Sequence, residues 1–316
     1  MSFVEQEGLH IRSITERKMT WFYIEKPTSL EVAFLAERFH FHPLDLDDVL
    51  SRIQRPKIDE YKDYLFIVLH FPIFDKENRI TRPSETDIFI GENYVVTVDC
   101  SGDLKPLARF FQECETDKRS RERYLGRSSG FLLYHILDRC VGSCFPILDK
   151  ITSNIDDIED IIFARPVPGT VREISLVRRD LISFRRVIHP QIAVFETLEK
   201  GEYPFLREEE EIYFGDIADH IRKIWGGLED GKEVIDGLAD TSNWLTSHRI
   251  QEIMRMLTII MGLLAPPTLI ASIYGMNIPL PGGVNSGSLL PFGILLALMA
   301  VIAGGLFLYM RHRKYL

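Results

Sequence analysis

The sequence predicts an α+β membrane protein in which a soluble N-terminal part precedes two C-terminal membrane-spanning helices. Residues 256–310 contain no Asp, Glu, Lys or Arg, so all 83 charged residues lie in the other 261 positions. Strand-like apolar runs are confined to roughly the first 105 residues, and helical patterns follow from about residue 132. The net charge of -9 and the mean hydropathy of -0.01 hide this division, because they average the two parts.

The N-terminal part mixes helix and strand signals, which predicts an α/β domain over residues 1–140. Residues 29–39 have a helical pattern, and 45–52 resemble a short acidic helix with Asp45 as its cap. The runs rich in β-branched and aromatic residues, which favour strands, are 64–70, 87–90 and 94–98.

A helical stalk is expected over residues 141–252. The segment 166–169 (PVPG) breaks the pattern, and Thr170 with Glu173 predicts a capping box for the next helix. Residues 207–274 contain no proline before Pro266, and a continuous helix of that length would reach about 100 Å. Its glycines at 226, 227, 231 and 237 each cost about 1 kcal/mol relative to alanine, so packing must compensate.

The C-terminal part, 253–316, is predicted to be a transmembrane hairpin with spans at about 256–274 and 288–310. The shorter span would be about 28 Å long, close to the thickness of a bilayer core. The connection is short and rich in Gly, Pro and Asn, so both spans must end on the same side. Arginines and a lysine flank the hairpin but are absent from its loop, which places both termini in the cytoplasm.

The first span has a face that is smaller and more polar than the rest. Positions three or four residues apart form one helical stripe, with Met, Thr, Met, Ala, Thr, Ser and Gly at 254, 258, 261, 265, 268, 272 and 275. Such a stripe suits either tight packing against the second span or a wetted lining, and periodicity does not choose between them. Pro266 and Pro267 interrupt the hydrogen bonding of this span, which requires neighbouring protein or water.

Composition excludes several function classes. A pI of about 5.6 disfavours nucleic-acid binding, which needs a basic patch. The four cysteines are too scattered for a disulfide framework, and no signal peptide, HExxH, GxSxG or P-loop pattern occurs. His40 with His42, and His135 with Cys140 and Cys144, are weak metal candidates, for which packing roles are the favoured interpretation. A membrane-anchored sensor without a pore remains a competing class.

Acidic residues gather at three places along the helical part. They are Asp156, Asp157, Glu159 and Asp160, then residues 208–211, then Asp216 and Asp219. Such runs usually form a solvated face. Brought together around a symmetry axis, however, these carboxylates would bind hard divalent cations through oxygen.

The sequence Tyr-Gly-Met-Asn at 274–277, which ends the first of two C-terminal spans, resembles the signature of the CorA family of divalent-cation (magnesium) transporters of the two-transmembrane GMN type. Residues 254–258 and 267–270 are similar to the first membrane helix of that family. Residues 214–220 are similar to its F-x-D-V-x-D-H segment, and 42–64 to its HPL…ED…RPK…DY run. The resemblance covers essentially the whole chain.

The resemblance implies a homopentameric funnel in the cell membrane. Gly275, Met276 and Asn277 would form the selectivity motif at the outer mouth, where Asn277 contacts a hydrated ion. The pore-lining positions would be Gln251, Met254, Leu257, Met261 and Thr268, with Met254 and Leu257 as an apolar constriction. Asp216 would bind a regulatory Mg²⁺ between subunits, with Asp75 as a weaker candidate for the partner carboxylate.

The function implied is Mg²⁺ influx that intracellular Mg²⁺ gates, with Co²⁺ and Ni²⁺ as surrogate ions. Partners would be membrane lipid, divalent cations and other copies of the chain; no enzymatic activity and no nucleic acid are expected. One departure is that the loop after the motif, 278–287, carries no acidic residue. The alternative is therefore a transporter similar to the related ZntB branch, which moves Zn²⁺ with proton coupling.

Overall fold

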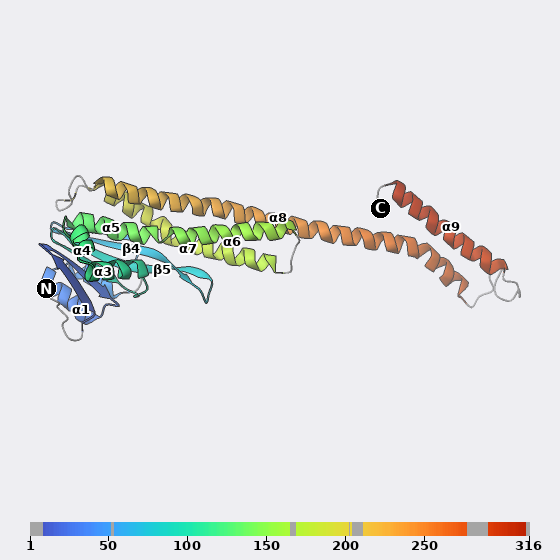
Figure 1. Ribbon diagram of the computed structural model, residues 1–316. Helices are drawn as coiled ribbons and strands as arrows, with labels where there is room; N and C mark the ends of the chain where they lie inside the picture. Colours follow the sequence, from blue (N-terminus) through green and yellow to red (C-terminus); the bar gives the residue numbers. More distant parts are fainter. Residues whose placement is uncertain are drawn as a thin grey trace. The chain divides into compact units, whose positions relative to one another are not determined.

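The computed structural model describes residues 9–51, 54–164, 169–201, 203, 211–276 and 290–313 (Figure 1). The chain forms two compact units, which divide between Ala239 and Asp240. One helix, α8 (Glu211–Tyr274), contributes residues to both. The sequence-derived boundaries near residues 140 and 252 stay a prediction.

The first unit is built on one six-stranded sheet with the order β1-β2-β6-β5-β4-β3. Its strands are β1 (Ile11–Glu16), β2 (Met19–Glu25), β3 (Lys57–Glu60), β4 (Tyr64–Asp75), β5 (Ile80–Gly91) and β6 (Tyr94–Asp99). The pair β2–β6 is parallel and the other pairs are antiparallel. The parallel pair joins the N-terminal hairpin to the meander formed by the later strands.

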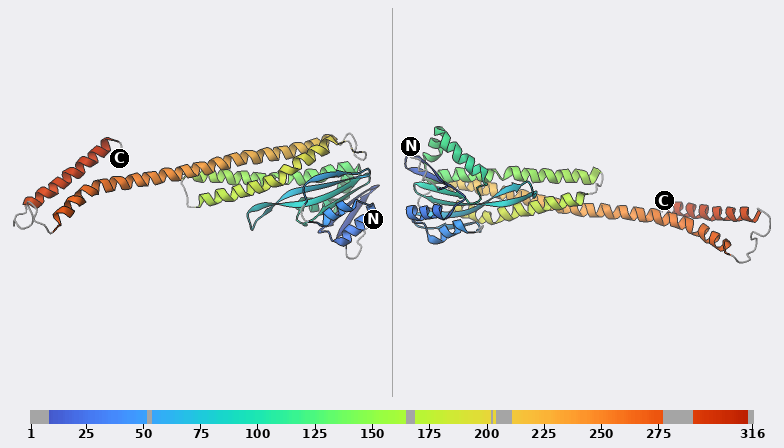
Figure 2. Two further views of the ribbon diagram at one scale, coloured as in Figure 1. Left: turned by 180° about the vertical axis from the view of Figure 1, so that it is seen from behind. Right: turned by 90° about the horizontal axis from the view of Figure 1, so that it is seen from below.

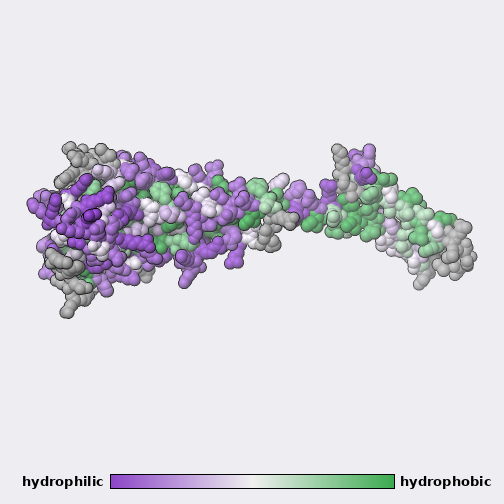
Figure 3. Space-filling view, viewed as in Figure 1, coloured by the Kyte–Doolittle hydropathy of each residue, from purple (hydrophilic) through white to green (hydrophobic). Residues whose placement is uncertain are grey.

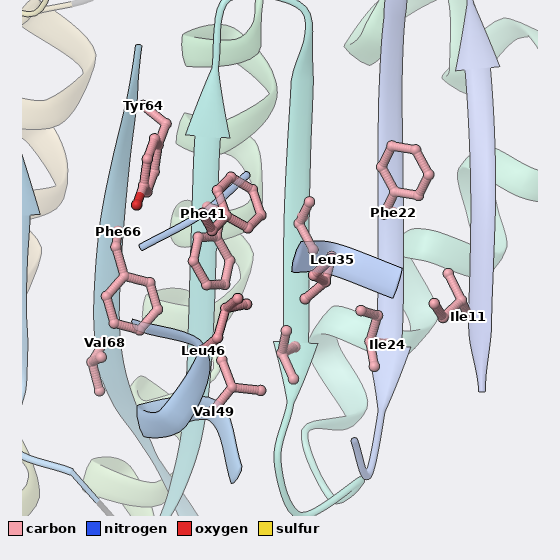
Figure 4. Packing of buried hydrophobic residues seen from close by; sticks show 13 residues of the cluster. Ile11, Phe22, Ile24, Leu35, Phe41, Leu46, Val49, Tyr64, Phe66 and Val68 are labelled. Carbon is pink, nitrogen blue, oxygen red and sulfur yellow. The ribbon is translucent and has the colours of Figure 1, made fainter. Parts of the chain in front are cut away.

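One face of the sheet is covered by α1 (Ser29–Phe39) and α2 (Pro43–Leu50). Figure 4 shows the apolar residues that fill this interface, from Ile11 and Phe22 on one side to Phe66 and Val68 on the other. Because side chains alternate along a strand, every second residue of β4 points into this layer. The aromatic ring of Phe41 stacks on Phe89, with ring centroids 4.1 Å apart.

The opposite face of the sheet packs against α3 (Lys105–Thr116), α4 (Lys118–Leu125) and α5 (Ser129–Gly142). Trp21 of β2 is fully buried and meets the rings of Phe110 and Phe111 at 5.2 and 5.0 Å. The sheet is therefore the middle layer of an α/β/α arrangement.

Three long helices complete the first unit: α6 (Phe145–Ala164), α7 (Thr170–Lys200) and the N-terminal part of α8, which lie side by side in Figures 1 and 2. Two of the α8 glycines allow this packing. A Cβ atom at Gly231 would lie 3.1 Å from the Leu181 side chain, and one at Gly227 would lie 3.0 Å from that of Leu148. Close helix packing thus compensates for the intrinsic cost of glycine at these positions.

The two short N-terminal helices test the sequence-based capping rules. The helix over 29–39 is confirmed, and Thr28 with Glu31 caps it. The second helix was predicted to start at Asp45, which is wrong: α2 starts at Pro43, and the His42 ring caps it. Asp45 is buried and accepts hydrogen bonds from the hydroxyls of Tyr61 and Tyr64, both 2.9 Å long. Its carboxylate holds α2 against the sheet instead of capping a helix.

The predicted capping box at Thr170 and Glu173 is also wrong. Gly169 is the N-cap of α7, in a left-handed conformation and without a side-chain cap. Glu173 instead pairs with Arg79 of the β4–β5 hairpin, with an N–O distance of 2.9 Å. The Glu173 side chain, which the local sequence pattern assigned to a helix cap, therefore forms a tertiary ion pair instead.

In the second unit, α8 continues to Tyr274 and α9 (Leu290–His312) follows. Within the described residues, three helical stretches are long and apolar enough to cross a membrane: Ser129–Ala164, Tyr213–Tyr274 and Phe292–His312. Half of the apolar window in the first stretch is buried, and it forms part of the core of the first unit. The windows in the other two are not buried at all, so these two are the candidate membrane spans.

Candidate functional site

The part of α8 that lies in the second unit exposes its large apolar side chains. They include Ile253, Met254, Met256, Leu257, Ile260, Met261, Leu264, Leu269 and Ile273. Figure 3 shows the corresponding hydrophobic surface over the C-terminal helices. Covering such a side chain is worth about 1.5–3 kcal/mol, so this surface must be covered by lipid or by other helices.

The pore-lining positions expected from sequence all lie on this helix, and all are exposed: Gln251, Met254, Leu257, Met261 and Thr268. At 3.6 residues per turn they cover about 120° of the helix surface, so they share one face. One helix encloses no space. This face could line a channel only with several copies of α8 around an axis.

The threonine hydroxyls on this helix are bonded internally. Thr258 Oγ1 donates to the Met254 carbonyl and Thr268 Oγ1 to the Leu264 carbonyl, each at 2.8 Å. Each hydroxyl hydrogen is thus used, while the oxygen keeps lone pairs for an outside donor such as water. The two threonines therefore present acceptors on the otherwise largely apolar C-terminal part of α8.

Pro266 and Pro267 lie inside α8, and the helix continues through them. Neither has an N–H, so the carbonyls of Gly262 and Leu263 lose their usual helical donors. Beside them, a Cβ atom at Gly262 would lie 3.1 Å from the Met310 side chain of α9. Close contact between the two apolar helices thus occurs where the backbone of α8 is irregular.

Gly275 and Met276, the first two residues of the predicted selectivity motif, follow directly after the last residue of α8. The Gly275 amide donates to the Ala271 carbonyl at 2.9 Å, and the Met276 amide to that of Ile273 at 3.3 Å. The Met276 side chain is exposed. Asn277 and the rest of the connection, 278–289, lie outside the described residues.

The predicted regulatory residue Asp216 lies near the N-terminal end of α8. Its side chain is largely exposed, and its Oδ1 is 4.0 Å from His220 Nε2. The fold also brings Asp138 of α5 close to it: burial raises the pKa of Asp138, His220 lowers it, and the charge of Asp216 raises it further. Sequence reasoning missed Asp138, because 78 positions separate it from Asp216.

The structure places Asp75 in the tight β4–β5 turn, where its carboxylate caps the backbone. It accepts hydrogen bonds from the amides of Glu77 and Asn78 at 2.9 and 3.2 Å, and from Asn78 Nδ2 at 2.8 Å. The Asn78 side chain is the main reason why its pKa is low. Among the described residues no hydrogen bond or ion pair joins Asp75 to Asp216, so their pairing stays a prediction about neighbouring subunits.

The other predicted ligand groups lie in ordinary structural settings. The four acids of α6 (Asp156, Asp157, Glu159 and Asp160) are exposed on the side away from its buried isoleucines. The His42 ring caps α2, and the buried Cys144 thiol donates to the Cys140 carbonyl at 3.6 Å. Residues 208–210 lie outside the described residues.

Comparisons with known proteins agree with this geometry. A family model described as CorA-like Mg²⁺ transporter protein matches residues 16–312. The cobalt/magnesium transport protein CorA of Thermotoga maritima is 31% identical over 283 residues, which cover 89% of this chain and 79% of that protein. The complete structure of the CorA magnesium transporter from Methanocaldococcus jannaschii has a TM-score of 0.81 at 25% identity, covering 96% of this chain and 93% of that one.

The zinc branch is a more distant match. The zinc transport protein ZntB of Pectobacterium carotovorum is 27% identical over 194 residues, which cover 60% of this chain and 57% of that protein. The full-length similarity therefore lies with the cobalt and magnesium transport proteins.

Proposed function

Because this chain belongs to the CorA-like Mg²⁺ transporter family, we propose that it mediates Mg²⁺ influx across the cytoplasmic membrane, with Co²⁺ or Ni²⁺ as surrogate ions. The family membership inferred from the YGMN segment is confirmed by the family match and by the 31% identical relative. The relatives are named as transport proteins, which supports a transport function for this chain.

The observation that carries the proposal is the exposed face of α8 formed by Gln251, Met254, Leu257, Met261 and Thr268. A single chain leaves this face open on a helix whose C-terminal part is long and apolar enough to cross a membrane. A ring of copies would turn it inward and enclose a path for an ion, and we propose a homopentamer. The outer helix α9 would then face lipid, since it carries no charged side chain before Arg311.

The proposed selectivity rests on Gly275, Met276 and Asn277. Mg²⁺ loses its water reluctantly, so a ring of uncharged Asn side chains at the mouth would bind the hydrated ion through its water shell. Further along, rings of Met254 and Leu257 would form an apolar constriction. Such a constriction blocks ions when it dewets, so a small widening would open it.

The proposed gate is Mg²⁺ bound between subunits at Asp216. The exposure of its carboxylate, and the nearby carboxyl of Asp138, support this placement; Asp75 is the weaker candidate from the adjoining subunit. An ion that bridges two subunits stabilises the arrangement in which they are close, so intracellular Mg²⁺ would favour the closed pore.

We further propose that both termini are cytoplasmic and that the loop after Asn277 is outside. Arginines on the membrane-flanking segments support this orientation. The membrane potential, negative inside, would then drive each positive charge inward by about 2.3 kcal/mol per 100 mV.

The test uses purified protein in liposomes that contain a Mg²⁺-sensitive dye. Wild type should admit Mg²⁺, and Asn277→Ala should abolish the signal. Asn285→Ala is the matched control, because it removes an amide from the same loop outside the motif, and it should conduct. Undiminished flux in Asn277→Ala would refute the selectivity site, and a monomer or dimer in detergent, measured by light scattering, would refute the pore.

The zinc alternative is supported by one feature, the absence of acidic residues from 278–287. It is separated by comparing Mg²⁺ and Zn²⁺ flux with and without a pH gradient in the same liposomes. Mg²⁺ flux that is independent of the gradient supports the magnesium assignment. Zn²⁺ flux that requires the gradient would replace it with proton-coupled zinc transport.

A further inference from the structure

A cluster of metal-ligating side chains lies in the first unit, far in sequence from the pore-lining residues. It spans three neighbouring strands. His70 of β4 is in register with Glu85 of β5, and Cys100, just after β6, donates its amide to the Glu85 carbonyl at 3.3 Å. Asp87 is two residues beyond Glu85 on β5, so both carboxyl groups point to the same face of the sheet.

The cluster continues the apolar layer under α1 and α2. Val68, labelled in Figure 4, is in register with Asp87, and both belong to the face that this layer covers. Polar groups at the end of a hydrophobic core are costly unless something compensates them. Their position therefore needs a physical reason.

The donor atoms have the spacing that a shared ion requires. Ligand atoms of Glu85, Asp87 and Cys100 all lie within 4.8 Å of one another, and the Cys100 thiol donates to Asp87 Oδ2 at 3.4 Å. In a tetrahedral zinc site, bonds of about 2.3 Å to sulfur and 2.0 Å to oxygen separate the two ligand atoms by about 3.5 Å. The observed sulfur–oxygen distance matches this value.

One carboxyl oxygen of the cluster has no hydrogen-bond partner among the residues that the structure describes. It is Oδ1 of Asp87, a side chain that is 0% exposed. In the part of the chain that the structure describes, no lysine or arginine forms an ion pair with Asp87 or Glu85. An unsatisfied buried polar atom costs about 1–3 kcal/mol, and more when it is charged. Burial, and then the charge of Glu85, raise the pKa of Asp87 to about 8.

Hydrogen bonds from outside the cluster orient the second carboxyl group. Glu85 Oε2 accepts from the Gln54 amide at 2.6 Å and lies 3.3 Å from His70 Nε2. The His70 backbone is itself fixed, since its amide donates to Gln191 Oε1 of α7 at 3.0 Å. Metal ligands in proteins are commonly held in this way by groups behind them.

We propose that Glu85, Asp87 and Cys100 bind a transition-metal cation of the Zn²⁺ or Co²⁺ class, with the His70 imidazole beside them as a positioning group or fourth ligand. Thiolate, carboxylate and imidazole together suit such borderline metals, whereas Mg²⁺ prefers sites made only of oxygen. The site lies wholly within the first unit and does not rest on the proposed transport function. An ion held there would join β4, β5 and β6 and stabilise the sheet.

The test uses full-length protein in detergent, stripped of metal with a chelator and titrated with Co²⁺ in excess Mg²⁺, which occupies oxygen-only sites. We expect one Co²⁺ per chain with a thiolate-to-Co²⁺ charge-transfer band in the near ultraviolet, which Zn²⁺ displaces. Cys100→Ser should lose the band, and Asp87→Asn should weaken Co²⁺ binding at least tenfold. Cys114→Ser, which removes a buried thiol outside the cluster, should keep both.

Two further measurements keep the test decisive. Asn277→Ala should leave the band unchanged, so failure of the proposed pore and failure of this site are distinguishable. Zn²⁺ should raise the unfolding temperature of wild type and of Cys114→Ser but not of Asp87→Asn. Asp87→Asn is nearly isosteric, so this variant should fold even if Cys100→Ser does not. Absence of the band in wild type, its retention in Cys100→Ser, or an equal Zn²⁺ shift in Asp87→Asn would overturn the proposal.

Discussion

The two units of this chain treat large apolar side chains in opposite ways. Phe89 in the first unit is 0% exposed and packs between Phe41 and Phe66, whereas Phe292 of α9 in the second unit is 61% exposed. Both are phenylalanines in regular secondary structure. The difference lies in what covers them, because the first unit buries Phe89 within its own core, whereas one chain leaves Phe292 uncovered.

Charge follows the same division. In the first unit buried carboxylates are held by tyrosines and backbone amides, as at Asp45 and Asp99. The second unit has no charged side chain between residues 256 and 310. The stability of the first unit should therefore depend on its own core, while that of the second should depend on membrane and assembly.

The largest effect is expected in the sheet core. Phe89→Ala should lower the free energy of unfolding by about 3–5 kcal/mol, because it removes buried contacts and leaves a cavity. Phe292→Ala, the matched change in the second unit, should cost less than about 1 kcal/mol in detergent. Urea unfolding of the full chain, followed by tryptophan fluorescence, checks both. Equal losses would mean that the second unit has its own buried core.

The second effect is acid sensitivity of the first unit. Burial, with Arg123, Arg139 and Arg127 nearby, lowers the pKa of His135 from 6.5 to about 4. His135 is therefore protonated below about pH 6.5 in the unfolded state, but only below about pH 4 in the folded state. Stability should fall across that window by up to about 3 kcal/mol as the pH decreases.

His135→Phe should remove this loss, because the ring still packs against Phe131 and Tyr124 but carries no proton. His312→Phe, in the second unit, should not change the pH profile. The measurement is the unfolding midpoint between pH 7 and pH 4. Identical profiles for wild type and His135→Phe would show that His135 is not the acid-sensitive group.

The third effect concerns the proposed constriction. Met254 and Met256 are similarly exposed, at 55% and 66%, but point to nearly opposite sides of α8. Met254→Ala should raise Mg²⁺ flux at high Mg²⁺ about tenfold, equivalent to ~1.4 kcal/mol of barrier, because a wider ring dewets less readily. Met256→Ala should leave flux in the liposome assay unchanged, and equal effects of the two would exclude this face as the pore lining.

The smallest effect is expected at the proposed gate. Asp216→Asn should shift the Mg²⁺ concentration that protects α8 from proteolysis about fivefold upward, which corresponds to ~1 kcal/mol. Asp157→Asn, on the exposed side of α6, serves as the control and should not shift it. Overlapping protection curves for wild type and Asp216→Asn would remove Asp216 from the regulatory site.

Much of the fold was predictable because its signals are local. The helix over 29–39, the long helix that ends at Tyr274 and the apolar helix after it follow from periodicity and length. The β-rich runs at 64–70 and 94–98 are strands, although β4 extends further, to Asp75. Sequence reasoning missed β1, β3, α3 and α4, whose patterns are interrupted by charged residues, and also the apolar run of β2 (MTWFYIE).

Side chains that act at a distance could not be assigned in the same way. Glu173 and Asp45 look like local caps in sequence, but their partners are Arg79 and two tyrosines from other elements. Similarly, the apolar stretch Ser129–Ala164 has the length and hydropathy of a membrane span, yet much of it belongs to a soluble core. The local sequence pattern shows which structures a segment is compatible with. Its packing partners determine which of them it adopts.

The sequence by itself determined the uncharged hairpin, the family and the face of α8 that carries Met254, Leu257 and Thr268. The uncharged helices follow from helical period and bilayer thickness, which act within one segment. The family and the pore-lining positions follow from the resemblance to short motifs such as Tyr-Gly-Met-Asn at 274–277. Only the tertiary structure brought Asp138 to Asp216, and Glu85, Asp87 and Cys100 to one point on the sheet. Strand order and helix packing set those distances. The residues lie on different helices and strands, so the periodicity of one helix or strand cannot predict that they are close.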